Sequence, residues 1–252
     1  MKHQSNILAL KYRPLNFQDL IGQEYLVETI QKSIQQNKIP NAYIFTGIRG
    51  VGKTTTARIV AKMLNCTVFD KNNNPDLINC EQAKAITEDR HPDVIEIDAA
   101  SNTSVENARE IIENVKYNPV LGKYKVYIVD EVHMLSKSAF NALLKTLEEP
   151  PPHSKFIFAT TEISKVPITI LSRCQRFDLR RVEKKTLSDF LKSIAKKEDI
   201  KISTEALNLI VKASDGSVRD SLSILDQANI LDGNILSNPS GYLENLTEIF
   251  IK

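Results

Sequence analysis

The sequence contains little cysteine, no long apolar run and almost no net charge. Its 252 residues include three cysteines, Cys66, Cys80 and Cys174, and nowhere approach the 18 consecutive apolar residues typical of a membrane-spanning helix. The first residues, MKHQSNILALKYRP, lack the apolar core and small-residue cleavage pattern of a secretion signal. These absences argue against a membrane partner and favour a cytoplasmic protein in a reducing compartment.

The charge balance leaves the class of partner open. The formal net charge is +2, from 33 basic and 31 acidic residues, and this balance neither demands nor excludes nucleic acid. If the chain binds DNA, a localised basic face must make the contact. The composition, 42% hydrophobic and 25% charged, is ordinary for a globular protein and is enough for one large domain or two small ones.

Short apolar runs alternate with helical patterns in the first 181 residues. Helices are predicted at 53–66, at 104–115 with Ser104 as N-cap, and at 136–151, where prolines close the last one. Strands that alternate with such helices predict a parallel, three-layer α/β sheet for residues 1–181. The predicted strands are 42–47, 93–100, 125–131, 155–161 and 175–180.

After Arg181 the pattern changes to three helical stretches with no strand between them. Ser203 or Thr204, and Ser217, lie at plausible N-cap positions of these helices. We therefore predict a small helical domain over 182–231. The weak periodicity of the remaining residues predicts a tail over 232–252.

The segment GIRGVGKT (47–54) matches the phosphate-binding pattern G-x-x-x-x-G-K-[ST] between a predicted strand and a predicted helix. Glycines let the backbone N–H groups of such a loop turn toward one anion, and the helix N-terminus adds its dipole. Lys53 would reach the β- and γ-phosphates of a nucleotide, and the Thr54 hydroxyl would ligate Mg²⁺. The alternative is a glycine-rich turn with a solvated lysine.

The segment VYIVDEVH (126–133) supplies the second half of such a site. Asp130, at the end of a buried strand, would face the same Mg²⁺, and Glu131 would polarise a water for attack on the γ-phosphate. The two carboxylates could instead cap the next helix. His133 could belong to the site, although packing is the interpretation that we favour.

Three more side chains are candidates on weaker grounds. The segment FATTE follows an apolar strand and could present the Thr161 hydroxyl, with Thr160 as the alternative, although threonine is simply common in strands. Phosphoryl transfer also needs positive charge near the γ-phosphate, supplied in cis or in trans. Arg173 and Arg219 are candidates for that charge, but spacing alone cannot distinguish them from surface arginines.

Six segments in order carry a resemblance over about residues 9–230: KYRPLNFQDLIGQE, GIRGVGKTTTARIVAKMLNC, VIEIDAAS, VYIVDEVHMLSKSAFNALLKTLEEPP, ATTEISKVPITILSRCQRFDLRR and GSVRDSLSILDQA. Together they resemble the gamma/tau family of bacterial DNA polymerase III, ATP-hydrolysing clamp-loader subunits of the AAA+ class. The resemblance implies an AAA+ sheet domain followed by a helical lid. It also implies an ATPase that loads the sliding clamp on primed DNA during replication.

The resemblance implies ligands, partners and residue roles. ATP and Mg²⁺ would bind, and the partners would be sister copies, the delta and delta-prime subunits, the sliding clamp and primer–template DNA. Arg173, in SRC, would reach into the ATP site of the adjacent subunit, Arg219 would sense the γ-phosphate from the lid in cis, and Thr161 would be the first sensor. Nucleotide contacts would come from Tyr12, Arg13, Ile21 and Gly22 on the adenine side, and from Gly47, Ile48, Arg49, Gly50, Val51, Gly52, Lys53, Thr54 and Thr55.

The sequence departs from this family in two places. The family carries a four-cysteine zinc module, but residues 66–92 retain only Cys66 and Cys80, with His91 as a conceivable third ligand. Two thiolates and a loop histidine do not complete a tetrahedron, so we expect no zinc and a looser remnant of the module. The family also continues into a helical collar domain, and the segment 232–252 does not resemble it.

Some alternatives stay open. The chain could be a truncated interaction module that binds ATP but does not assemble or load clamps. Another AAA+ machine, such as a Holliday-junction ATPase, is disfavoured by SRC and by LLKTLEEPP. DNA contact would involve residues 101–104, Arg109 and Lys137, because those elements face the DNA channel in the family, although lysines on solvated helix faces are equally expected.

Overall fold

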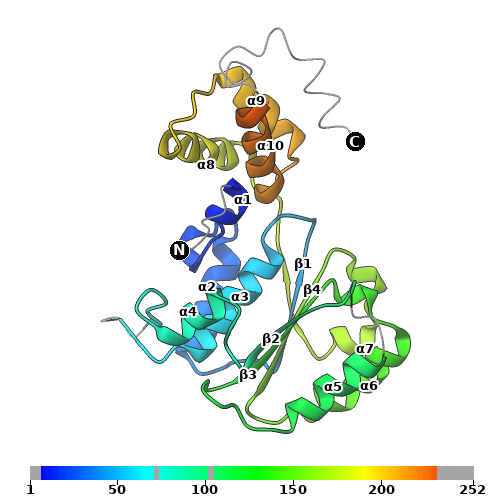
Figure 1. Ribbon diagram of the computed structural model, residues 1–252. Helices are drawn as coiled ribbons and strands as arrows, with labels where there is room; N and C mark the ends of the chain where they lie inside the picture. The colour runs from blue at the N-terminus through cyan, green and yellow to red at the C-terminus, as the bar shows by residue number, and fades with distance from the viewer. Residues whose placement is uncertain (1–6, 71–73, 102–104, 232–252) are drawn as a thin grey trace.

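The computed structural model describes residues 7–70, 74–101 and 105–231. The predicted N-cap Ser104, most of the segment 101–104 and the predicted tail lie outside these residues. Figure 1 shows a sheet with helices on both faces, and a group of helices beyond one end of that sheet. No helix within the described residues is long and apolar enough to cross a membrane.

The described residues contain a parallel sheet of five strands, which confirms the predicted α/β class. The strands lie in the order β2-β3-β4-β1-β5, so that β1 separates β4 from β5. Because the strands are parallel, their carboxyl ends lie at the same edge, so the phosphate loop that follows β1 and Asp130 at the end of β3 are brought to that edge. The strand bounds are Ala42–Thr46 (β1), Val94–Asp98 (β2), Lys125–Asp130 (β3), Ser154–Thr160 (β4) and Gln175–Asp178 (β5).

Alternating side chains of each strand serve two separate cores. Tyr43 and Phe45 face the core that contains Ile59, whereas Ile44 faces the core that contains Leu143. Helices therefore cover both faces of the sheet, as Figure 1 shows. They are α2 (Glu24–Gln35), α3 (Lys53–Asn65) and α4 (Glu81–Thr87) on one side, and α5 (Val105–Val115), α6 (Lys137–Glu148) and α7 (Ile168–Leu171) on the other.

Three short 3-10 turns, Phe17–Asp19 (η1), Val132–Met134 (η2) and Ile163–Lys165 (η3), lie between these elements. One boundary differs from the sequence-based prediction by more than two residues. Helix α6 ends at Glu148, three residues before the predicted end, because Pro150 to Pro152 cannot continue a helix. Helix α2 was not predicted, although Leu26 and Ile30 bury one face of it at helical spacing.

The lid helices are α8 (Lys184–Lys197), α9 (Thr204–Ala213) and α10 (Val218–Leu231). The predicted N-caps at Ser203 and Ser217 are confirmed, because their hydroxyls accept hydrogen bonds from the N–H groups of residues 206 and 220 at 3.1 and 3.2 Å. The lid core also contains Leu8 of α1 (Leu8–Lys11). The division into two domains near residue 181 stays a prediction.

Candidate nucleotide site

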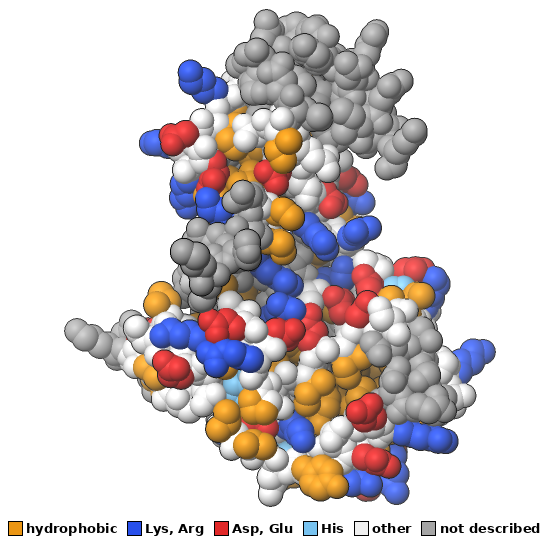
Figure 2. Space-filling view, in the orientation of Figure 1, with side chains coloured by type: hydrophobic (Ala, Val, Ile, Leu, Met, Phe, Trp, Pro, Cys, Tyr) orange, Lys and Arg blue, Asp and Glu red, His pale blue; other side chains and the backbone are white. Residues whose placement is uncertain are grey.

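A cavity of about 690 Å³ lies between the carboxyl edge of the sheet and the lid. Figure 2 shows basic and acidic side chains together where the helical lid meets the sheet layer. The walls come from distant parts of the chain: the N-terminal segment, the phosphate loop, the ends of β2 and β3, and α10 of the lid. Predicted site residues on its wall are Tyr12, Arg13, Ile21, Arg49, Gly50, Val51, Gly52, Lys53, Thr54, Thr55, Asp130, Glu131 and Arg219.

The phosphate loop has the backbone that its glycines permit. Gly50 has a φ of 79° and Gly52 a φ of 102°, in the left-handed region that other residues rarely adopt. At Gly47, a Cβ would lie 2.6 Å from the carbonyl oxygen of Leu179, so the loop passes the end of β5 too closely for a side chain. The turn therefore brings the N-terminus of α3 to the cavity.

Lys53 lies at the first position of α3 and is buried. Its Nζ donates to the carbonyl oxygens of Gly47 and Ile48, each at 3.0 Å. Burial lowers the pKa of Lys53, and the carboxylates of Glu131 and Asp130 act in the opposite direction. An anion in the loop would give this buried cation a direct partner, so the residues present fit a nucleotide triphosphate.

Thr54 and Asp130 meet directly at the end of β3. The Thr54 hydroxyl donates to Asp130 Oδ2, and Asp130 Oδ1 accepts from the N–H of Glu131 at 2.9 Å. A hydroxyl and a carboxylate at one point are oxygen ligands of the kind that Mg²⁺ prefers. The two residues that the sequence assigns to a metal are therefore brought together.

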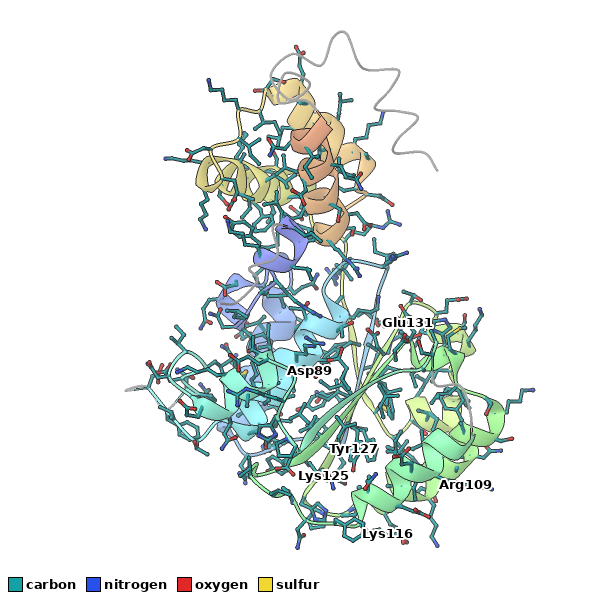
Figure 3. All side chains as sticks on the ribbon, viewed as in Figure 1. Asp89, Arg109, Lys116, Lys125, Tyr127 and Glu131 are labelled. Atoms are coloured by element: carbon teal, nitrogen blue, oxygen red, sulfur yellow. The ribbon has the colours of Figure 1, made fainter. Side chains whose placement is uncertain are left out.

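Glu131 has an unusual backbone that redirects its side chain. Its φ of 45° and ψ of 45° are left-handed, a conformation that costs a residue other than glycine of the order of 1 kcal/mol or more. Figure 3 shows Glu131 at the carboxyl end of β3, with Lys125 near the other end of that strand. The Glu131 Oε2 accepts from the N–H and the Oγ1 of Thr161, at 3.1 and 3.0 Å. Thr161, rather than Thr160, is therefore the hydroxyl that contacts this carboxylate.

The lid contacts the phosphate loop through the start of α10. The N–H of Arg219 donates to the carbonyl oxygen of Gly50 at 3.2 Å, and the Arg219 side chain lines the cavity. A Cβ on Gly50 would lie 2.0 Å from Ser217 Oγ, so the first turn of α10 sits directly against the loop. The lid and the phosphate loop are consequently held as neighbours by backbone contacts.

The N-terminal segment forms another wall. Arg13 Nε donates to Thr55 Oγ1 at 3.2 Å, and burial followed by repulsion from Arg58 lowers the pKa of Arg13. The Tyr12 hydroxyl donates to Glu198, which raises the pKa of Tyr12 to about 12. Ile21 lines the cavity, whereas Gly22 is not part of the wall and packs against Val182 of the lid core.

Comparisons with known proteins agree with this arrangement. A family model described as "DNA polymerase III, delta subunit" matches residues 22–183, more than half of the chain. The chain belongs to the DNA polymerase III clamp-loader family. A second model, described as "DNA polymerase III clamp loader subunit, ATPase lid domain", matches residues 186–233.

Curated relatives place the chain with the gamma/tau subunits of this clamp-loader family. The chain is 47% identical over 244 residues to the DNA polymerase III subunit tau/gamma of Haemophilus influenzae, covering 95% of this chain and 35% of the relative. It is 48% identical over 227 residues to the tau subunit of Bacillus subtilis, covering 89% of this chain and 40% of the relative. The chain thus spans well under half the length of these relatives and resembles their AAA+ and lid regions.

A solved structure of the Thermotoga maritima RuvB Holliday junction branch migration motor has a TM-score of 0.65 and 18% identity to the chain. The alignment covers 94% of this chain and 72% of that one. At this identity the likeness shows a shared fold and no shared activity. The Holliday-junction alternative therefore gains no support beyond the fold.

Five predicted site residues are not part of the cavity wall: Gly22, Gly47, Ile48, Thr161 and Arg173. The first four contact residues of the wall or lie beside them in the chain, whereas Arg173 has other partners. Arg173 follows α7, and its guanidinium donates to the Thr169 carbonyl oxygen, to Ser172 Oγ at 3.4 Å and to the Glu148 carboxylate. None of these partners lines the cavity. Within one chain, Arg173 is therefore not assembled with the other candidates. The sequence did not indicate Glu148, which holds this guanidinium at the end of α6.

The two cysteines that remain where the family carries a zinc module are buried together. Cys66 and Cys80 share a small apolar cluster with Ala83, and burial raises the pKa of Cys66 to about 12. Both ring nitrogens of His91 have other partners, the N–H of Asp93 at 3.1 Å and Gln82 Oε1 at 3.0 Å. The described residues contain no group of three or more His, Cys, Asp or Glu side chains that could hold a metal ion.

Proposed function

We propose that the chain is an ATP-binding and ATP-hydrolysing subunit of a DNA polymerase III clamp loader. The observation that carries the proposal is the convergence of both phosphate-site motifs and the lid arginine on one cavity. Membership of the clamp-loader family supports the assignment. The proposed partners are sister copies, the delta and delta-prime subunits, the sliding clamp and primer–template DNA, and the proposed compartment is the cytoplasm.

In this proposal the phosphate loop binds the triphosphate. Its N–H groups and the N-terminus of α3 face the anion, and Lys53 exchanges its two carbonyl partners for phosphate oxygens. Thr54 and Asp130 would hold Mg²⁺ at the point where they now share a hydrogen bond. When bound, Mg²⁺ supplies charge that stabilises the phosphate oxygens.

Glu131 would orient the attacking water and accept its proton. The two hydrogen bonds from Thr161 fix one carboxylate oxygen and leave the other available for a water. The Arg219 side chain would bring positive charge from the lid to the γ-phosphate. The hydrogen bond from the backbone N–H of Arg219 to the carbonyl oxygen of Gly50 would couple the position of the lid to the conformation of the phosphate loop. Tyr12, Arg13 and Ile21 would enclose the nucleoside end.

Arg173 would serve the site of an adjacent copy. It lies outside its own cavity, is about one-third exposed, and belongs to a segment that resembles the clamp-loader arginine finger. An arginine supplied in trans is worth about 10³–10⁵ in rate. To act there, the Arg173 guanidinium must either break its contact with Glu148 or reach the adjacent copy while it keeps that contact.

ATP hydrolysis per chain, measured as protein concentration rises in the presence of primed DNA, tests the proposal. We expect specific activity to increase with concentration in the native chain and to collapse in Arg173→Ala. Lys184→Ala, a lysine at the start of α8 outside the cavity, is the matched control and should behave as the native chain. A flat, near-zero rate in every protein, with ATP still bound, would favour the non-assembling interaction module instead.

A further inference from the structure

His133 lies beside the proposed catalytic carboxylate, on the turn η2 directly after β3. Its side chain is only 6% exposed. A buried imidazole could be ordinary core packing, the interpretation that the sequence favoured. The contacts of its two ring nitrogens are polar, however, and both lead to groups around the site.

The Nδ1 side of the ring faces Thr160 and Glu131, and Glu131 lines the cavity. Nδ1 lies 3.0 Å from Thr160 Oγ1 and 3.4 Å from Glu131 Oε2. The same Oε2 accepts the two hydrogen bonds from Thr161. The same oxygen of Glu131 is therefore in contact with three groups, the N–H and the hydroxyl of Thr161 and the ring of His133.

The Nε2 side of the ring faces the segment that follows β4. Nε2 lies 3.4 Å from Glu162 Oε1, and the N–H of Glu162 donates to Thr160 Oγ1 at 3.0 Å. Lys165 pairs with the Glu162 carboxylate at 2.8 Å, which lowers the pKa of Glu162 and keeps it charged. The imidazole thus bridges two carboxylates, one at the site and one on the segment that leads to α7.

We propose that His133 is a positioning residue for Glu131. The ring, held by Thr160 on its Nδ1 side and by Glu162 on its Nε2 side, keeps the Glu131 carboxylate against Thr161. This inference rests on the proposed ATPase function. The left-handed backbone of Glu131 directs its side chain toward Thr161, and the His133 ring prevents the carboxylate from rotating away from Thr161.

Three substitutions separate the contacts of the ring from its volume. Asn keeps a polar atom near the Nδ1 position, Gln keeps one near the Nε2 position, and Phe keeps the volume without either. We expect His133→Asn to retain a kcat close to the native value, whereas His133→Gln and His133→Phe lose about 10- to 100-fold. The KM for ATP should remain close to native in all three, because His133 does not line the cavity.

A second measurement does not depend on turnover. The chain has four histidines, so the ring ¹⁵N signals of His133 in the intact protein can be assigned by comparison with His133→Asn. We expect Glu131→Gln to shift mainly Nδ1 and Glu162→Gln to shift mainly Nε2. If the native chain hydrolyses no ATP, the proposed function fails while this measurement still decides the role of His133. Native-like kcat in His133→Phe, or ring signals that ignore Glu131→Gln, would overturn the inference.

Discussion

Replacing Gly50 by alanine tests the contact between the phosphate loop and the lid. The new Cβ would meet Ser217 Oγ at 2.0 Å, well inside van der Waals contact. Ser217 cannot turn away freely, because its hydroxyl caps α10 by accepting from the N–H of Asp220 at 3.2 Å. Gly50 also has a φ of 79°, which alanine adopts only at a cost.

The loss of stability in Gly50→Ala is the sum of two contributions, the left-handed backbone at residue 50 and the disturbed N-cap at Ser217. A left-handed backbone costs a residue with a Cβ roughly 1–2 kcal/mol, and loss of a serine N-cap costs about 1 kcal/mol. Gly50→Ala should therefore lower the free energy of unfolding by about 2–3 kcal/mol. Ser217→Gly alone should cost only a few tenths, because glycine is tolerated at an N-cap. Since Ser217→Gly removes the clash, the double variant should lose about 1 kcal/mol less than the sum of the single variants.

Urea unfolding of the native chain, both single variants and the double variant measures this coupling directly. ATP affinity, followed with a fluorescent nucleotide, should fall in Gly50→Ala and partly recover in the double variant. Strict additivity of the two substitutions in unfolding free energy would refute the account, because it would mean that the lid does not press on Gly50 in solution.

Two further predictions concern buried charges. Asp93 is fully buried, and its carboxylate accepts hydrogen bonds from three backbone N–H groups of residues 120–122, each at 2.7 Å. Burial alone would raise the pKa of Asp93, but the three hydrogen bonds outweigh burial and hold this pKa below the ordinary value. The charged Asp93 therefore stabilises the fold above about pH 4, and this stabilisation is lost as the pH falls further. Asp93→Asn should lower the free energy of unfolding by about 2–4 kcal/mol at pH 7. In urea titrations, the stability of this variant should depend less on acid pH than that of the native chain. Burial, followed by repulsion from Arg58 and Arg13, lowers the pKa of Lys62 to about 8. Lys62→Met should therefore raise the free energy of unfolding at pH 7 by about 1–2 kcal/mol, and this gain should shrink between pH 8 and pH 10 as the native lysine becomes neutral. A difference between variant and native chain that stays constant across that range would contradict the lowered pKa.

The strands could be predicted because each is a short apolar run with clear ends. Every predicted strand is present within two residues of its predicted bounds. Both faces of this parallel sheet are covered, so that Ile44 on one face and Ile128 on the other are both buried and strands such as β1 are nearly continuous apolar runs. The order of the strands could not be predicted from these patterns. Insertion of β1 between β4 and β5 depends on pairing between segments more than 100 residues apart.

The phosphate loop and the acidic strand end could be predicted because their chemistry depends on local spacing. The contacts that arrange them could not. Ser217 was predicted as an N-cap, but its position against Gly50 arises only when the lid folds back on the sheet. Glu148 and Asp93 look like ordinary surface acids in the sequence, and burial or a partner far along the chain gives each its role.

The most direct test of the shared-site account mixes two inactive variants. Glu131→Gln lacks the proposed base but keeps Arg173, whereas Arg173→Ala keeps a complete site but offers no arginine to its neighbour. Each alone should hydrolyse ATP at a small fraction of the native rate in the presence of primed DNA. The account predicts that mixing them restores activity, because Arg173 of one variant reaches the intact site of the other. A mixture no more active than the average of its components would contradict it.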